Sequence, residues 1–189
     1  LSVYSRRSQF EKNMTLIAET YILETIKSFR GLKSNAEKAF AQIQDADFHF
    51  QPDQESNSVA ILIQHLAGNM LSRFTDFLTS DGEKQDRNRD SEFNDSKQTK
   101  EQLLNYWNKG WDCLFSALQS LQAEDLLKTV TIRQEPHLVL RALQRQLVHY
   151  AYHTGQIVFL CKMIRKSGFK SLSIPRGKSG DFVQVVPGD

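Results

Sequence analysis

Residues 143–160 read LQRQLVHYAYHTGQIVFL, and this stretch decides the fold. Apolar side chains recur in it at helical spacing: Leu143, Leu147, Ile157 and Leu160. Beside them runs a line of polar side chains, three or four residues apart: Gln146, His149, His153 and Gln156. A helix with both lines packs on other helices along the apolar one and presents the polar one to a pocket. The stretch therefore predicts a helical protein built around a site.

Three further segments have the same periodicity, at about 9–44, 59–78 and 97–121. Asn57 or Ser58 is placed to cap the second, and Thr99 and Gln102 have the spacing of a capping box at the third. The fourth helix is predicted over about 137–166, with Pro136 beside its first turn. We therefore expect an all-α protein, a four-helix bundle.

The connections between these helices differ in character. Residues 80–96 are dense in charge and predict a long, solvated surface crossover between helices 2 and 3. Residues 129–132 alternate as TVTI and predict a short strand or hairpin between helices 3 and 4. We expect the bundle to cover residues 1–167, and residues 168–189 to form a polar C-terminal tail packed on or near it.

Composition excludes several classes of protein. The 189 residues include 24 Lys and Arg against 22 Asp and Glu, and a net charge of +2 provides no basic face for nucleic acid. No apolar run approaches the roughly 20 residues of a membrane span, and residues 1–10 lack a signal-peptide core. The 2 cysteines cannot form a disulfide framework or a four-thiolate zinc site. We expect a cytoplasmic protein whose partner is a small molecule, not nucleic acid or a membrane.

His149 and His153 stand four residues apart, on one face of the predicted fourth helix. Two imidazoles at this spacing can bind one metal ion at about 2.1 Å. Tyr150 occupies the position at which a zinc protease carries its catalytic Glu, so that activity is excluded. The pair alone also fits two half-buried histidines that bond to neighbouring side chains.

His65 adds a third candidate ligand. It lies among apolar residues of the predicted second helix. If the second and fourth helices run antiparallel, it lies at a similar level along the bundle axis to the pair. Three histidines with an open further position are typical of a catalytic metal site. We therefore predict His65, His149 and His153 as metal ligands. The residues that we expect to line the pocket are polar: Asn69, Arg73, Asp76, Gln146 and Gln156. Arg73 and Asp76 also fit an ion pair within their own helix.

These residues resemble the DinB-like superfamily of metal-dependent four-helix proteins, in which one histidine comes from the second helix and a His-x-x-x-His pair from the fourth. The matching segments are IQHLAGNM at 63–70 and VHYAYHTGQ at 148–156. Two others, NMLSRFTDFLTSDGEK at 69–84 and SLSIPRG at 171–177, are similar to a bacterial branch described as a domain of unknown function.

The resemblance implies an up-down-down-up bundle, a homodimer, and a divalent metal on the three histidines, usually zinc or nickel. In some members the metal activates a low-molecular-weight thiol, so we expect a metal-dependent transferase of the thiol type, or a hydrolase, that acts on a small molecule. The alternatives are a non-catalytic metal- or ligand-binding stress-response protein and a structural dimer with vestigial histidines. The sequence identifies no general base, so the catalytic residues stay open.

Overall fold

Four long α-helices make up most of the described chain. The computed structural model describes residues 3–181. Its long helices are α1 (Val3–Phe40), α2 (Val59–Phe74), α3 (Lys100–Ser120) and α4 (Val139–Arg165). Strands β1 (Thr129–Ile132) and β2 (Glu135–Leu138) pair as an antiparallel hairpin between α3 and α4. The all-α class and the hairpin are confirmed.

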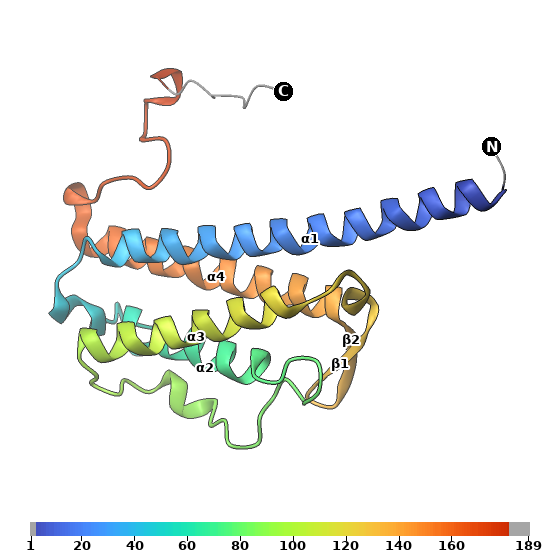
Figure 1. The fold of residues 1–189 in the computed structure, drawn as a ribbon. Helices are drawn as coiled ribbons and strands as arrows, with labels where there is room; N and C mark the ends of the chain where they lie inside the picture. The colour runs from blue at the N-terminus through green and yellow to red at the C-terminus, as the bar shows by residue number, and fades with distance from the viewer. Residues whose placement is uncertain (1–2, 182–189) are drawn as a thin grey trace.

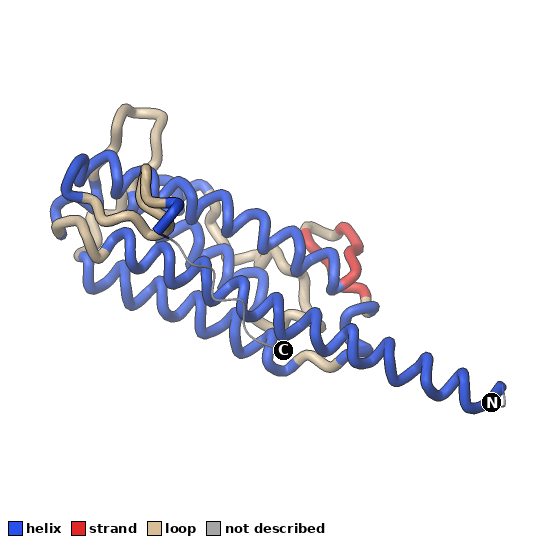
Figure 2. Tube along the Cα trace, turned by 90° about the horizontal axis from the view of Figure 1, so that it is seen from above, coloured by secondary structure: helices blue, strands red, loops and turns tan. Residues whose placement is uncertain are grey.

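The helices pack in two main pairs. Figure 1 shows α1 lying against α4 and α2 lying against α3, and these two pairings are the most extensive in the described chain. Seen from above, the hairpin lies at one end of the helices, and α1 continues past it toward the N-terminus (Figure 2). Large side chains from all four helices are fully buried between them, among them Phe29, Leu66, Trp107, Trp111 and Tyr150.

α2 is the most buried of the four helices, since all of its residues except Leu71 are buried. It approaches α3 closely at one point, where a Cβ added to Gly110 would lie 2.9 Å from the Cα of Ala67. Only glycine fits at that position. Any polar side chain on α2 is therefore surrounded by protein and needs a partner there.

The helix starts follow the predicted capping signals. The side chain of Ser58 accepts a hydrogen bond from the backbone N–H of Ile61, and Thr99 and Gln102 form the predicted capping box. The C-terminal end of α2 does not follow the prediction. α2 ends at Phe74 and not at 78, because the chain turns at Asp76, which has a φ of 50°.

The start of α4 was predicted wrongly. Pro136 does not open the helix; it pairs with Thr131 in the hairpin, and α4 begins only at Val139. Arg133 and Gln134 connect the strands with φ values of 55° and 65°, as in a two-residue turn. The carboxylate of Asp81 accepts hydrogen bonds from both of their backbone N–H groups, at 2.9 and 2.8 Å, and so stabilises a turn that contains no glycine.

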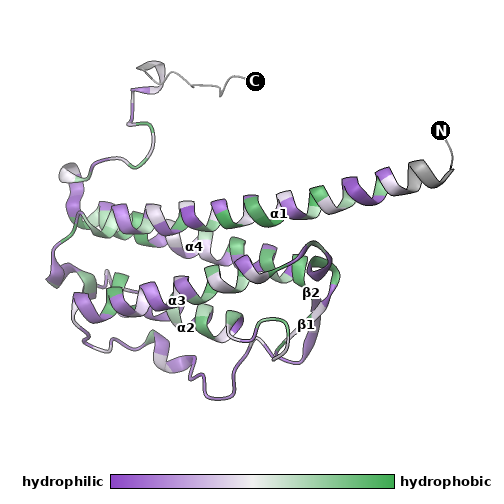
Figure 3. Cartoon of the chain, viewed as in Figure 1, coloured by the Kyte–Doolittle hydropathy of each residue, from purple (hydrophilic) through white to green (hydrophobic). Residues whose placement is uncertain are grey.

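The connection from α2 to α3 returns along the helices (Figure 1) and is largely hydrophilic (Figure 3). It is not simply a solvated loop, as the charge density predicted. The side chains of Arg87 and Glu92 are only 5% and 10% exposed. They fold inward because a short 3-10 turn, Asp90–Phe93, packs on α2.

The chain after α4 begins against the bundle. The backbone of Lys170 donates to Oε1 of Gln42 at 2.7 Å and accepts from its Nε2 at 3.1 Å, while Phe169 and Leu172 pack on the core. Residues 1–2 of the expected bundle and 182–189 of the expected tail lie outside the described residues. Within the described part, none of the helices has the length and apolarity that crossing a membrane requires.

Candidate metal centre

Three histidine side chains meet between α2 and α4. Nε2 of His149 lies 3.2 Å from Nε2 of His65 and 3.1 Å from Nε2 of His153. The three rings offer nitrogen atoms that all lie within 4.8 Å of one another. The structure thus brings together the three residues that the sequence singled out, although His65 is 84 residues from His149 and still further from His153.

Two of the rings are oriented through their other nitrogen. Nδ1 of His65 lies 2.9 Å from Oε2 of Glu92, and Nδ1 of His153 lies 2.7 Å from Oε1 of Gln156. Because both partners are acceptor oxygens, each Nδ1 carries the hydrogen and each Nε2 carries a lone pair. This is how metal-binding histidines are usually held, with the second nitrogen donating to a carboxylate or an amide oxygen.

Hydrogen bonds within the cluster cannot satisfy all three Nε2 atoms. His149 faces the lone pairs of both His65 and His153, and a neutral ring has only one hydrogen to donate. Nitrogens bound to one tetrahedral zinc ion at about 2.1 Å lie about 3.4 Å apart, close to the two distances observed here. The donor set therefore fits a single cation at its centre.

The rings of His149 and His153 are electrically neutral at pH 7. Burial, followed by the proximity of His153 and His65, lowers the pKa of His149 from 6.5 to about 3. Burial also lowers the pKa of His153, and the hydrogen bond with Gln156 offsets only part of that effect. Neutral imidazole is the form that binds metal ions.

Glu92 reaches His65 from the crossover between α2 and α3. Its two carboxylate oxygens also accept hydrogen bonds from Nε and Nη2 of Arg87, both at 2.7 Å. Burial alone would raise the pKa of Glu92, but the hydrogen bonds from His65 and Arg87 outweigh it and lower the pKa. Gly68 makes room for this carboxylate, since a Cβ there would lie 2.4 Å from Oε1. His65 thus donates to an ionised and firmly held acceptor.

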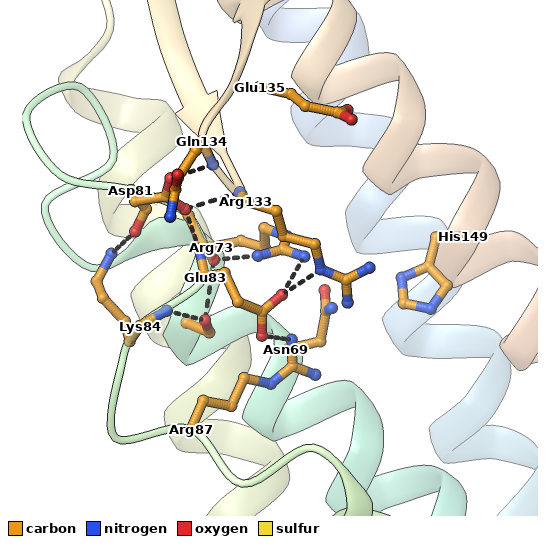
Figure 4. Close-up of polar contacts among 12 residues, drawn as sticks. Asn69, Arg73, Asp81, Glu83, Lys84, Arg87, Arg133, Gln134, Glu135 and His149 are labelled. Carbon is orange, nitrogen blue, oxygen red and sulfur yellow. Dashed lines mark hydrogen bonds and ion pairs between the residues drawn. The ribbon is translucent and has the colours of Figure 1, made fainter.

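A second carboxylate, that of Glu83, accepts hydrogen bonds from three arginines beside the cluster (Figure 4). Its oxygens accept from Arg73 at 2.9 Å and from Arg87 and Arg133 at 3.0 Å. Arg73 also donates to the carbonyl of Gly82. The crossover, the hairpin and α2 are joined at this point.

A cavity of about 190 Å³ borders His65 and His149. Three of the predicted pocket residues, Asn69, Arg73 and Gln146, line it. The others lie elsewhere. Gln156 instead bonds to His153, and Asp76 lines a larger cavity of about 620 Å³ that touches none of the three histidines.

Arg73 and Asp76 do not form the ion pair that their spacing permits. Arg73 is turned toward Glu83 and Gly82, while Asp76 lies beyond the end of α2 and is exposed. Asn69 has a buried partner, because it accepts a hydrogen bond from the hydroxyl of Tyr150 at 2.9 Å.

Sequence reasoning missed the residues that surround the histidines: Arg87, Glu92 and Arg133. All three come from the crossover or the hairpin turn, where no periodicity indicates which side chains point inward. One signal was present in the crossover. Phe93 is its only large apolar residue between 80 and 96, and its ring lies 4.7 Å from that of His65, centroid to centroid.

Comparison with known protein families identifies a match. The family model described as "Protein of unknown function (DUF1572)" matches residues 16–178, which include all three histidines as well as Glu92 and Arg87. No curated protein and no solved structure matches the chain.

Proposed function

Because this chain belongs to the DUF1572 family of proteins of unknown function, we propose its function from the site itself: His65, His149 and His153 bind one divalent metal ion, on which a small molecule is activated. One observation carries the proposal. Three histidine rings direct Nε2 atoms at one point, while Glu92 and Gln156 hold the hydrogens of two of them on the opposite nitrogens.

Zinc or nickel is the proposed metal. All three donors are imidazole nitrogens, which suit these ions, and no thiolate or carboxylate joins them in the described part of the chain. Three protein ligands leave a further coordination position open to a ligand. His65 and His153 are buried and His149 is half-buried, and the 190 Å³ cavity that borders His65 and His149 could hold such a ligand.

The resemblance to the DinB-like superfamily supports a more specific activity, transfer of a low-molecular-weight thiol. A bound divalent cation favours the thiolate over the thiol at neutral pH. The residues of this chain supply the remaining functions: Glu92 orients His65, and Asn69 and Gln146 offer amide groups to whatever occupies the cavity. The superfamily's up-down-down-up topology is part of the proposal, and the crossover that returns along α2 supports it (Figure 1).

A non-catalytic binding protein is the second candidate. It is favoured by the lining of the 190 Å³ cavity, which contains no carboxylate, tyrosine or cysteine to act as a general base or nucleophile. A screen of thiols against electrophiles, with zinc- and nickel-loaded protein, separates the two candidates. Turnover supports the transferase, and binding without turnover supports the second candidate.

We also propose a homodimer, as the resemblance implies. The N-terminal part of α1 supports it, since this part extends past the other helices with exposed apolar side chains: Phe10, Met14, Leu16, Ile17 and Leu23. Light scattering coupled to gel filtration measures the mass, and a mass near 21.8 kDa would show a monomer.

The metal site is tested by elemental analysis of protein purified without added metal. We expect one equivalent of a divalent metal in the native chain and none in the His149→Ala/His153→Ala variant. His137→Ala is the matched control, because His137 lies in β2 outside the cluster, and it should keep its metal. Equal metal content in the native chain and the double variant would refute the assignment.

A further inference from the structure

The cavity beside the histidines is strongly cationic. Four arginines line it, Arg73, Arg89, Arg133 and Arg145, and no carboxylate does. They come from four separate parts of the fold: α2, the crossover, the hairpin turn and α4. Figure 4 shows the side chain of Arg133 extending from the hairpin turn toward His149.

The nearby carboxylates do not neutralise these arginines. Glu83 and Glu92 are shared among Arg73, Arg87 and Arg133, which leaves one positive charge in excess. Within the described chain, Arg89 and Arg145 make no ion pair and add two more. A divalent ion on the three histidines would raise the local charge further. Arg73 is buried, whereas Arg89, Arg133 and Arg145 are exposed, so water screens part of this charge. An anion in the cavity would complement the positive charge that remains.

Buried polar atoms in the lining also lack partners. Arg73 is 5% exposed and Gln146 is 4% exposed. Nε of Arg73 and Oε1 of Gln146 are both buried without a hydrogen bond to any described residue. An unsatisfied buried donor costs about 1–3 kcal/mol, and an acceptor atom supplied by a ligand beside Arg73 would remove that cost.

Of the four arginines that line the cavity, Arg145 lies on the same helix as two of the proposed metal ligands. It precedes His149 by four residues on α4, so the two side chains share one face of the helix. The cavity volume of about 190 Å³ is below the roughly 300–1,000 Å³ of pockets for drug-sized ligands, so it suits a small metabolite.

We propose that this cavity binds the oxyanion group of a small substrate, a carboxylate or a phosphate, between Arg73, Arg133 and Arg145, while another atom of the same molecule occupies the open position at the metal. The second half of this statement rests on the proposed function. The first half does not, because the arginines, the free Nε and the cavity are features of the chain alone. The proposal assigns the substrate class: small anions, not neutral molecules.

The anion site is tested first on metal-free protein. Titration calorimetry with inorganic phosphate and with succinate, at low ionic strength, should detect binding of at least one, and the comparison shows whether the site prefers phosphate or carboxylate. Arg145→Gln should weaken that binding about tenfold or more, since a charge-assisted contact is lost. Arg141→Gln is the matched control, one turn earlier on α4, exposed and outside the cavity lining, and should bind as the native chain does.

The link to the metal is tested with cobalt-loaded protein and two thiols of equal length, 3-mercaptopropionate and 3-mercapto-1-propanol. The cobalt–thiolate absorption band reports binding. We expect the carboxylate-bearing thiol to bind about tenfold more tightly, and Arg145→Gln but not Arg141→Gln to remove the difference. If cobalt does not bind, the proposed function fails, while the phosphate and succinate titrations still decide the anion site. No anion binding, or equal effects of Arg145→Gln and Arg141→Gln, would overturn the inference.

Discussion

Glu92 accepts a hydrogen bond from His65, with 2.9 Å between Oε2 and Nδ1, although the two residues belong to different elements and lie 27 positions apart. The pairing determines which nitrogen of His65 is available to a metal. It also makes a loop residue part of the site, since Glu92 is itself held by Arg87 in the same crossover.

Replacing Glu92 by Gln should therefore weaken metal binding. The amide preserves the size of the side chain but removes the charge that orients His65 and that Arg87 neutralises. We expect the zinc affinity to fall about 10- to 100-fold, as is typical when such a partner is removed. Competition with a chromophoric chelator measures it. Glu101→Gln, an exposed position in the first turn of α3, is the control; equal affinities for both variants would contradict the role of Glu92.

Gly68→Ala should act on the same carboxylate by a steric route. The added Cβ would lie 2.4 Å from Oε1 of Glu92, so the carboxylate must move away from His65. We expect a loss of stability of about 1–3 kcal/mol from overpacking, together with weaker zinc binding. Gly31→Ala provides the contrast. Nothing lies within 4 Å of that position in α1, and the variant should be about 1 kcal/mol more stable in urea unfolding.

Acidification should destabilise the metal-free protein before its carboxylates titrate. The folded-state pKa of His149 is lowered to about 3, below the ordinary value of 6.5, so the unfolded chain binds more protons between these values. The free energy of unfolding therefore falls as the pH drops below about 6.5. Denaturant unfolding in EDTA between pH 7 and 5 measures how steeply the free energy of unfolding changes with pH. This slope reports the number of protons taken up on unfolding, which should be smaller by up to one in His149→Gln.

Metal binding should also weaken in acid, because protons compete for the ligating nitrogens. Since burial lowers the pKa of His149 to about 3, we expect the metal to be retained at pH 5 and lost as the pH falls toward 3. Metal retained unchanged below pH 3 would argue against histidine ligation, and an identical slope of stability against pH for the native chain and His149→Gln would argue against a buried neutral His149.

Asp81 offers a test of the hairpin that carries Arg133. Its Oδ1 accepts from the backbone of Glu83 and Arg133, and its Oδ2 from that of Gln134. Asp81→Ala removes all three hydrogen bonds and should cost roughly 1–2 kcal/mol, a moderate value because the carboxylate is partly exposed to solvent. Asp81→Asn keeps the Oδ1 contacts and should lie in between. Urea unfolding checks the order of the three proteins, and equal stability would show that the turn does not depend on Asp81.

The contribution of Asp81 to stability should also depend on pH. Hydrogen bonds from the backbone of Glu83 and Gln134 lower the pKa of Asp81 to about 2. A lowered carboxyl pKa contributes stability above its ordinary value of 3.8, and that contribution is lost as the pH falls toward 2. The difference between the native chain and Asp81→Ala should therefore shrink below pH 4.

Local signals in the sequence predicted most of the helical structure. Ser58 and Thr99 cap helices as expected, because a capping hydrogen bond involves only neighbouring residues. Pro136 shows where such reasoning fails. A proline fits the first turn of a helix and also an edge strand, and the pairing with β1 decided between the two.

The candidate site likewise contains some residues that local signals predicted and others that they could not. His149 and His153 could be paired from their spacing on one helix, and His65 could be added from its place on an apolar face. Glu92 could not be predicted, because its partner is fixed by the path of a loop that has no periodicity. The partner of Arg73 also stayed open in the sequence. Asp76 lies on the same predicted helix and could have formed an ion pair with it, but the structure pairs Arg73 with Glu83 in the crossover.

The separation of His65 from His149 by 84 residues also sets an order of events during synthesis. The ribosome releases the chain from its N-terminus, so α2 and the crossover emerge while α4 has still to be made. At that stage His65 and Glu92 can meet, but the protein offers one histidine of the three and cannot retain a metal ion. The proposed ligand set is complete only after α4 has docked, so a metal ion at this site would bind after that step.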